Sequence, residues 1–400
     1  MLASLSLVFL VGLSAAAIVR RLHLPGLVGM IATGIVLGPY VLDLLDPSLL
    51  GISAELRQIA LIIILIKAGL SLDLGDLKKV GRPAVLMSFV PACCEIAGYV
   101  LLAPPLLGVT RAEAAVMGAV LAAVSPAVVV PRMVRLMEEG RGTDKRIPQL
   151  ITAGASCDDV FVIVLFTTFT GMAQGGDVSW RALADVPVSI LLGVALGALC
   201  GAALAWIFEA AHAHGHTVRG SLKALIVLAL ACGLSAVETA LKGTLAVSGL
   251  LAVMSMACVL RARCVPAVTA GLAVKCGKLW LAAEVLLFVL VGAAVDIRYT
   301  LAAGGAAVAL IAAALLLRAA GVLLCLLRTP LVARERLFCV LAYMPKATVQ
   351  AAIGAVPLAM GLPCGSIVLS VAVLGILLTA PLGAFAIDLT APRLLRQTLS

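Results

Sequence analysis

Apolar runs long enough to cross a lipid bilayer divide most of this chain. We count thirteen runs of about 15 to 28 residues, and most of them can cover a hydrocarbon core of about 30 Å as a helix. Short stretches that are charged or contain proline and glycine separate them. Because 63% of the residues are apolar and only 12% are charged, the composition excludes an ordinary soluble domain. The chain is therefore predicted to be an all-α polytopic membrane protein.

The predicted transmembrane segments are 2–19, 25–41, 58–72, 83–104, 113–137, 148–172, 182–208, 219–237, 243–260, 277–295, 300–327, 337–358 and 364–387. The first resembles a signal peptide in length. It lacks a basic stretch before its apolar part, and Arg20 and Arg21 follow it instead. We expect it to be retained as a helix.

The basic residues indicate how the chain is oriented in the membrane. With the N-terminus outside, 21 of the 29 basic residues fall on one side and 5 on the other, while Lys67, Arg318 and Lys346 lie inside segments. This bias favours a cytoplasmic C-terminus and explains the net charge of +9 without a nucleic-acid partner. The compact length, with a short tail after Ile387, suggests a prokaryotic inner-membrane protein.

Segments seven apart along the chain share features, which predicts two inverted-topology repeats. Segments 3 and 10 both end in an apolar run followed by G-x-x-x-D, at Asp73 and Asp296. Segments 5 and 12 both contain internal prolines. We therefore predict a first repeat over 1–172 (helices 1–6), a connecting helix 7 within 173–217 and a second repeat over 218–400 (helices 8–13).

Pro126 and Pro345 lie inside segments 5 and 12. Proline lacks a backbone donor and clashes with the preceding turn, so each is expected to break its helix near the middle of the membrane. Freed carbonyls and helix ends at that depth are tolerated where they line a cavity or are buried in protein, and they can hold ions. A simple proline kink is the alternative for either segment alone.

Asp158 and Asp159 lie about ten residues into segment 6, near the membrane midplane. Each carboxylate costs about 2.5 to 3.5 kcal/mol there if it is uncompensated. Two adjacent acids cannot both ionise easily without a cation, so a proton and a Na+ or Li+ ion are expected to compete for them. Ser125, Thr348 and Gln350 are expected to converge on the same site and to supply oxygen ligands. No cofactor is implied.

Three other interpretations of these residues remain open. The aspartates can be structural ion-pair partners, although three intramembrane cations face four acids, including Glu95 and Glu284. An intramembrane aspartyl protease also uses two aspartates, but these two are adjacent on one helix. A sodium-coupled transporter of organic solutes would share the architecture, yet it would need a free basic group for an anionic solute.

Five stretches of the sequence resemble the monovalent cation:proton antiporters, and within them the sodium/proton antiporters of the NHA branch, which have an Asp-Asp ion site. The matching stretches are 24–29 with 38–39, 125–131, 158–159, 288–296 and 345–354. The resemblance implies a secondary active transporter that is a homodimer. It also implies a core domain, made of helices 4–6 and 11–13, that moves as an elevator against a dimerisation domain made of the remaining helices.

The resemblance also implies roles for five residues. Asp159 would be the main carrier of cation and proton, with Asp158 beside it. Lys346 would pair with Asp158, and Arg318 with Glu95, which looks like the acidic partner found in the NHA branch. An aspartate at position 158 is associated with electrogenic exchange, but the additional pair of Glu95 and Arg318 leaves the stoichiometry open.

Other features are open in the sequence alone. Residue identity does not set the preference among Na+, Li+ and K+ or the pH dependence. His212, His214 and His216 can sense pH or bind a metal, or can belong to a solvated loop. Gly193, Gly197 and Gly201 form two overlapping G-x-x-x-G motifs that suit close helix contact, either within one protomer or between two.

Overall fold

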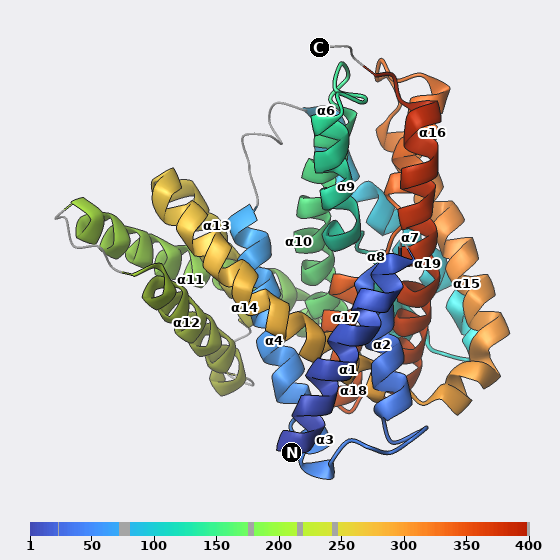
Figure 1. Cartoon of the computed structure of the whole chain (residues 1–400), viewed down its shortest axis with the longest axis horizontal. Helices are drawn as coiled ribbons and strands as arrows, with labels where there is room; N and C mark the ends of the chain where they lie inside the picture. Colours follow the sequence, from blue (N-terminus) through green and yellow to red (C-terminus); the bar gives the residue numbers. More distant parts are fainter. Residues whose placement is uncertain (23, 72–80, 175–179, 214–218, 242–246, 398–400) are drawn as a thin grey trace. The chain divides into compact units, whose positions relative to one another are not determined.

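The computed structural model describes residues 1–22, 24–71, 81–174, 180–213, 219–241 and 247–397 of the chain. Within these ranges the regular structure is helical and contains no β-strand (Figure 1). The chain forms two compact units. The first comprises Met1–Ala54, Asp73–Phe169 and Leu287–Ser400, and the second comprises Glu55–Leu72 and Thr170–Leu286. The predicted all-helical fold class is confirmed.

The first unit contains the helices in which both predicted proline breaks occur. Its helices are α1 (Leu2–Arg21), α2 (Gly26–Leu37), α3 (Pro47–Gly51), α6 (Arg82–Met87), α7 (Val90–Leu107), α8 (Arg111–Ala122), α9 (Pro126–Glu138), most of α10 (Ile147–Gln174), α15 (Ile297–Cys325), α16 (Ala333–Ala342), α17 (Thr348–Gly354), α18 (Val356–Ala359) and α19 (Gly365–Leu394). The residues of the predicted core, helices 4–6 and 11–13, therefore lie almost entirely in this unit. The functional division into core and dimerisation domains remains a prediction.

The second unit contains the remaining long helices. These are most of α4 (Ser53–Ser71), α11 (Trp180–Ala213), α12 (Gly220–Leu241), α13 (Gly249–Arg263) and most of α14 (Pro266–Ala293). Each of the thirteen predicted segments coincides with one of these helices or with a broken series of shorter ones. Nine helical stretches in the described residues are long and apolar enough to span a membrane, with shorter apolar helices at Gly26–Leu37 and Thr348–Ala359. The protein is therefore a multi-pass membrane protein.

One boundary differs clearly from its prediction. The tenth segment was expected to begin at residue 277, but α14 begins at Pro266. Lys275 and Lys278 interrupt the apolar run, and in the sequence they resemble loop residues. In the structure Leu272, Cys276 and Trp280 are buried at successive intervals of four residues, so one helical face continues past both lysines.

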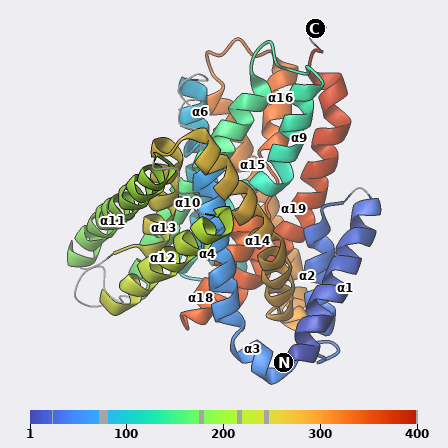
Figure 2. The same ribbon diagram turned by 60° about the vertical axis from the view of Figure 1, so that its left-hand side comes forward.

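The two proline-containing segments run in opposite directions within the first unit. In Figure 1, α8 leads into α9 toward the end at which α19 finishes, whereas α16 leads into α17 and α18 away from that end. Figure 2 shows from another side that α16 lies near the same end as α9, whereas α18 lies toward the opposite end. Opposed broken helices of this kind are the arrangement that inverted repeats generate.

Glycines allow α2 to cross the end of α14 at backbone distance in the first unit. A Cβ atom added at Gly34 would overlap the carbonyl oxygen of Val289, and one added at Gly292 would overlap that of Ile31. Neither glycine has a positive φ angle, so their role is steric. Small residues serve close helix contact in membranes, where apolar side chains gain little by leaving lipid.

The G-x-x-x-G residues of α11 face α13 in the second unit. Cβ atoms added at Gly193, Gly197 and Gly201 would overlap or crowd backbone oxygens of Ser248, Ala252 and Met256, respectively. The Ser255 hydroxyl also donates a 2.9 Å hydrogen bond to the Val194 carbonyl. This motif therefore packs two helices of one protomer, which the sequence left undecided.

We predict that Gly197→Ala destabilises the protein by about 1–3 kcal/mol, because the added methyl must displace the α13 backbone. Gly233→Ala in α12 is the matched control, since a Cβ there meets no atom within 4 Å. Helix propensity favours that exchange by up to about 1 kcal/mol. Thermal unfolding in detergent, followed by intrinsic fluorescence, measures both. Equal unfolding temperatures for the two variants would contradict the assigned helix contact.

Candidate functional site

The break between α8 and α9 follows from the chemistry of proline. In a continuous helix the Ala122 carbonyl would accept a bond from the backbone nitrogen of residue 126, but Pro126 carries no hydrogen there. α8 ends at Ala122, and Pro126 occupies the first turn of α9, where its lack of a donor costs nothing. The Ala122 carbonyl is thereby free to bind side chains.

The second break lies between Ala342, where α16 ends, and Thr348, where α17 begins. Pro345 lies inside it. The two breaks are joined by a backbone hydrogen bond of 2.8 Å from the Ser125 amide to the Pro345 carbonyl. The unwound segments therefore cross one another in the interior of the first unit.

Arg318 of α15 satisfies carbonyls from both breaks. Its Nε donates to the Tyr343 carbonyl at 2.7 Å, and its Nη1 donates to the Ala122 carbonyl. These carbonyls terminate α16 and α8, where the helix dipole is negative. The Arg318 side chain is 1% exposed, so its charge has no access to water.

Glu95 of α7 lies between the two buried cations. Its Oε2 accepts from Arg318 Nη1 at 2.8 Å and from Lys346 Nζ at 2.6 Å. The expected partnership of Arg318 with Glu95 is therefore present. The expected ion pair of Lys346 with Asp158 is not formed, because Lys346 instead binds Glu95 and approaches the Ala122 carbonyl at 3.5 Å.

Asp158 of α10 is held by Arg318 and by the first break. Its Oδ2 accepts from Arg318 Nη2 at 3.0 Å and from the Val124 amide at 2.9 Å. Its Oδ1 has no hydrogen-bond partner in the part of the chain that the structure describes. Asp158 thus keeps one carboxylate oxygen for a further ligand.

Asp159 is buried but, across the described residues, it forms no ion pair, and its Oδ1 has no hydrogen-bond partner. The hydroxyl of Ser125 is also buried and without a partner in those residues. Thr348 is buried at the first position of α17. The structure therefore contains three unsatisfied buried oxygens at or next to the aspartate pair: Asp158 Oδ1, Asp159 Oδ1 and Ser125 Oγ.

The sequence predicts Gln350 near the site but not the hydrogen bonds that it forms. Its Nε2 donates to the Ala123 carbonyl at 2.7 Å, and its Oε1 accepts from the Ala347 amide at 2.8 Å. Gln350 therefore links the two breaks as a structural group, and its Oε1, the atom that could bind a cation, already accepts one hydrogen bond.

Tyr343 and Thr379 also contact this network, and neither is predicted from the sequence. The Tyr343 ring lies 5.2 Å from the Arg318 guanidinium, and its hydroxyl donates to the Met87 carbonyl at 3.0 Å. Thr379 of α19 accepts from the Lys346 amide at 2.9 Å. In the sequence each appears as a polar side chain within an apolar run. For threonine this signal is weak, because its hydroxyl can donate to a carbonyl on the preceding turn of its own helix, as Thr379 does to Gly375.

Three acids and two bases are buried together in this network: Glu95, Asp158 and Asp159 with Arg318 and Lys346. With all five ionised, the network carries one uncompensated negative charge. Burying a charge without a partner is costly, so the arrangement favours uptake of one positive charge. Asp159 is the member without an ion-pair partner, and it is where that charge is most needed.

Some predicted features fall on residues or side chains that the structure does not describe. His214, His216 and Asp73 fall outside the described residues, and the side chain of His212 is not described. No cluster of three or more histidine, cysteine or acidic side chains that could hold a metal ion occurs in the ranges that are described.

Comparisons with known proteins identify a family whose profile matches most of this chain. The profile of the family described as "Sodium/hydrogen exchanger, transmembrane" matches residues 5–390. The chain is similar to sodium/hydrogen exchanger 9B2 of Xenopus tropicalis, with 34% identity over 366 residues, and to that of Homo sapiens, with 35% identity over 364 residues. These alignments cover 87% and 86% of the chain but only 65% of either relative.

The fold resembles a solved structure. The sodium proton antiporter MjNhaP1 from Methanocaldococcus jannaschii superimposes with a TM-score of 0.82, covering 98% of both chains at 21% identity. At this identity the likeness concerns the fold.

We predict that Arg318→Met destabilises the protein by about 3–5 kcal/mol, because Glu95 and Asp158 lose a shared partner in the buried interior. Arg393→Met, at an exposed arginine in the last turn of α19, is the control and should be nearly neutral. Unfolding temperature and the monodisperse fraction after purification in detergent report the difference. Similar stability of both variants would show that Arg318 does not hold the network together.

Proposed function

This chain belongs to the sodium/hydrogen exchanger family, and we propose that it exchanges a monovalent cation, Na+ or Li+, for protons across a membrane. Membership of a family of transporters agrees with the expectation that it is not an enzyme. The observation that carries the proposal is the unpaired, buried carboxylate of Asp159 in a network with one excess negative charge. One proton or one monovalent cation neutralises that network.

Competition for Asp159 provides the coupling. A proton on the carboxylate removes the charge that attracts Na+, and a bound Na+ opposes protonation, so the two occupy the site alternately. The unsatisfied oxygens of Asp158, Asp159 and Ser125 suit a hard alkali cation, which prefers oxygen ligands. Thr348 can add a hydroxyl from the other broken helix.

Arg318 and Lys346 act as fixed counter-charges in this proposal. Both are engaged by Glu95, and Arg318 is also engaged by Asp158. They therefore reduce the excess charge to a single unit instead of cancelling it. The same pairing leaves neither of them free for an anionic substrate, which disfavours the sodium-coupled organic-solute transporter. Asp158 and Asp159 are adjacent on α10, which disfavours a protease.

Alternating access by an elevator motion is the mechanism that we favour. All side chains of the network belong to the first unit, so that moving its core as a body would carry the site without breaking its ion pairs. We further propose that the membrane is a prokaryotic inner membrane and that the C-terminus is cytoplasmic, an orientation that the distribution of basic residues supports. A homodimer, as the resemblance implies, would give the moving core a stationary support.

We predict that Asp159→Asn abolishes cation-driven proton movement, because the amide neither titrates nor neutralises a cation. The measurement uses proteoliposomes with a pH-sensitive dye, to which Na+, Li+ or K+ is added in turn. Asp144→Asn, at an exposed carboxylate in the loop after α9, is the matched control and should retain full activity. Activity in Asp159→Asn, or no response to any cation in the wild type, would refute the carboxylate-carrier mechanism.

A further inference from the structure

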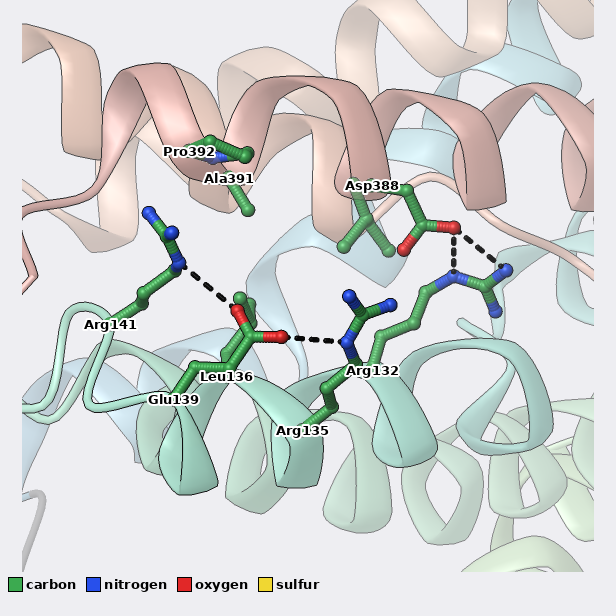
Figure 3. Close-up of a pocket in the computed structure, with 9 residues that line it drawn as sticks. Arg132, Arg135, Leu136, Glu139, Arg141, Asp388, Ala391 and Pro392 are labelled. Atoms are coloured by element: carbon green, nitrogen blue, oxygen red, sulfur yellow. Dashed lines mark hydrogen bonds and ion pairs between the residues drawn. The ribbon is translucent and has the colours of Figure 1, made fainter.

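A second charged cluster lies in the first unit, in a pocket between the ends of α9 and α19 (Figure 3). Arg132 and Arg135 of α9 and Arg141 of the following loop line it, together with Glu139 and Asp388. Buried Leu136, Ile387 and Ala391 supply apolar walls. Three arginines against two carboxylates leave one excess positive charge, opposite in sign to the ion-binding network.

The Glu139 carboxylate lies between two of the arginines and binds both. Its Oε1 accepts from Arg135 Nε at 2.7 Å, and its Oε2 accepts from Arg141 Nε at 3.0 Å (Figure 3). The hydrogen bond from Arg135, above all, lowers the pKa of Glu139, so the carboxylate is ionised at neutral pH. Both guanidinium groups are thus bound at Nε, and in the described residues their terminal nitrogens have no hydrogen-bond partner.

The loop after α9 fixes the position of Arg141. Gly140 and Gly142 adopt positive φ angles of 66° and 65°, which favour glycine. The Arg141 amide donates to the Leu136 carbonyl at 2.8 Å, and the Gly142 amide donates to the Arg396 carbonyl at 2.8 Å. The backbone on both sides of Arg141 is therefore anchored, and its side chain is only 21% exposed.

Arg132 has a different role. Its Nε and Nη2 both contact Asp388 Oδ2 at 3.2 Å (Figure 3). Its Nη1 donates to the Val128 carbonyl at 3.0 Å. Each of the three guanidinium nitrogens of Arg132 thus has a partner, and Arg132 joins α9 to α19 as one wall of the pocket. The excess positive charge is presented by Arg135 and Arg141.

We propose that this pocket binds a phosphate group through the terminal nitrogens of Arg135 and Arg141. Guanidinium groups bind phosphate oxygens in bidentate fashion, through two parallel N–H···O bonds. A phosphodiester also carries the single negative charge that the pocket lacks. The group can belong to a phospholipid headgroup, since α19 and the stretch formed by α8 and α9 are long and apolar enough to cross a membrane, or to a soluble phosphate.

The site would report on the transport machinery without belonging to it. Arg135 lies nine residues after Pro126 on α9, about 14 Å along the helix from the first break. α19 carries Thr379, which binds the Lys346 amide. A phosphate in the pocket would thus brace the far ends of two helices that hold the ion-binding residues.

The test is a thermal-unfolding titration of the full chain in a phosphate-free detergent. Inorganic phosphate is added in one arm and phosphatidylglycerol in the other, with sodium chloride at matched ionic strength as reference. We expect at least one arm to raise the wild-type unfolding temperature by about 2 °C or more. In the Arg135→Gln, Arg141→Gln double variant, the half-maximal concentration should rise about tenfold or more, because charge-assisted hydrogen bonds are lost.

Arg393→Gln, which removes an exposed arginine of α19 that does not line the pocket, should respond like the wild type. If the double variant does not fold, Arg135→Lys with Arg141→Lys retains the charges and replaces it, with a weaker response expected. Asp159→Asn should keep the full response, so failure of the transport proposal leaves this one intact.

A response to phosphatidylglycerol alone would identify a lipid headgroup as the source, and a response to inorganic phosphate would show that a free phosphate suffices. No response in either arm, or equal responses in the wild type and the double variant, would overturn the proposal and leave only a general ionic effect.

Discussion

Arg318 occupies the point where four buried acceptors meet: the carboxylates of Glu95 and Asp158 and the terminal carbonyls of α8 and α16. Each would be costly if it were left without a donor in an apolar interior. A single planar guanidinium with five donors can serve them all, which the point charge of lysine cannot do. The interrupted helices, and hence the site between them, depend on this one side chain.

The network is balanced in a way that separates stability from function. Glu95, Arg318, Lys346 and Asp158 compensate one another, so these four charges sum to zero without a bound ion. Asp159 stands beside this set with its charge unpaired. A buried site can bind and release a cation only if its ligands are incompletely satisfied, and the unpartnered oxygens of Asp158, Asp159 and Ser125 meet that condition.

Much of this arrangement was predictable from the sequence, for physical reasons. A run of apolar residues has few alternatives to a membrane helix, and Pro126 and Pro345 lack the donors that continuous helices need. The start of α14 was misplaced because a lysine on one helical face looks the same in a sequence as a loop lysine. The predicted ion pair of Lys346 with Asp158 was wrong. A lysine side chain can reach several acids, and which one it binds depends on where α7 places Glu95. The roles of Tyr343 and Thr379 depend equally on tertiary packing.

The hydrogen bond between the Ser125 amide and the Pro345 carbonyl joins the two interrupted helices through main-chain atoms alone. Replacing either side chain by alanine leaves that amide and that carbonyl in place. Alanine scanning therefore does not test this hydrogen bond. The effect of replacing Ser125 by alanine reports only on the loss of its hydroxyl. Measuring the contribution of this hydrogen bond to stability requires a change in the backbone. An ester in place of the amide at Ser125 removes the donor and leaves every side chain unchanged.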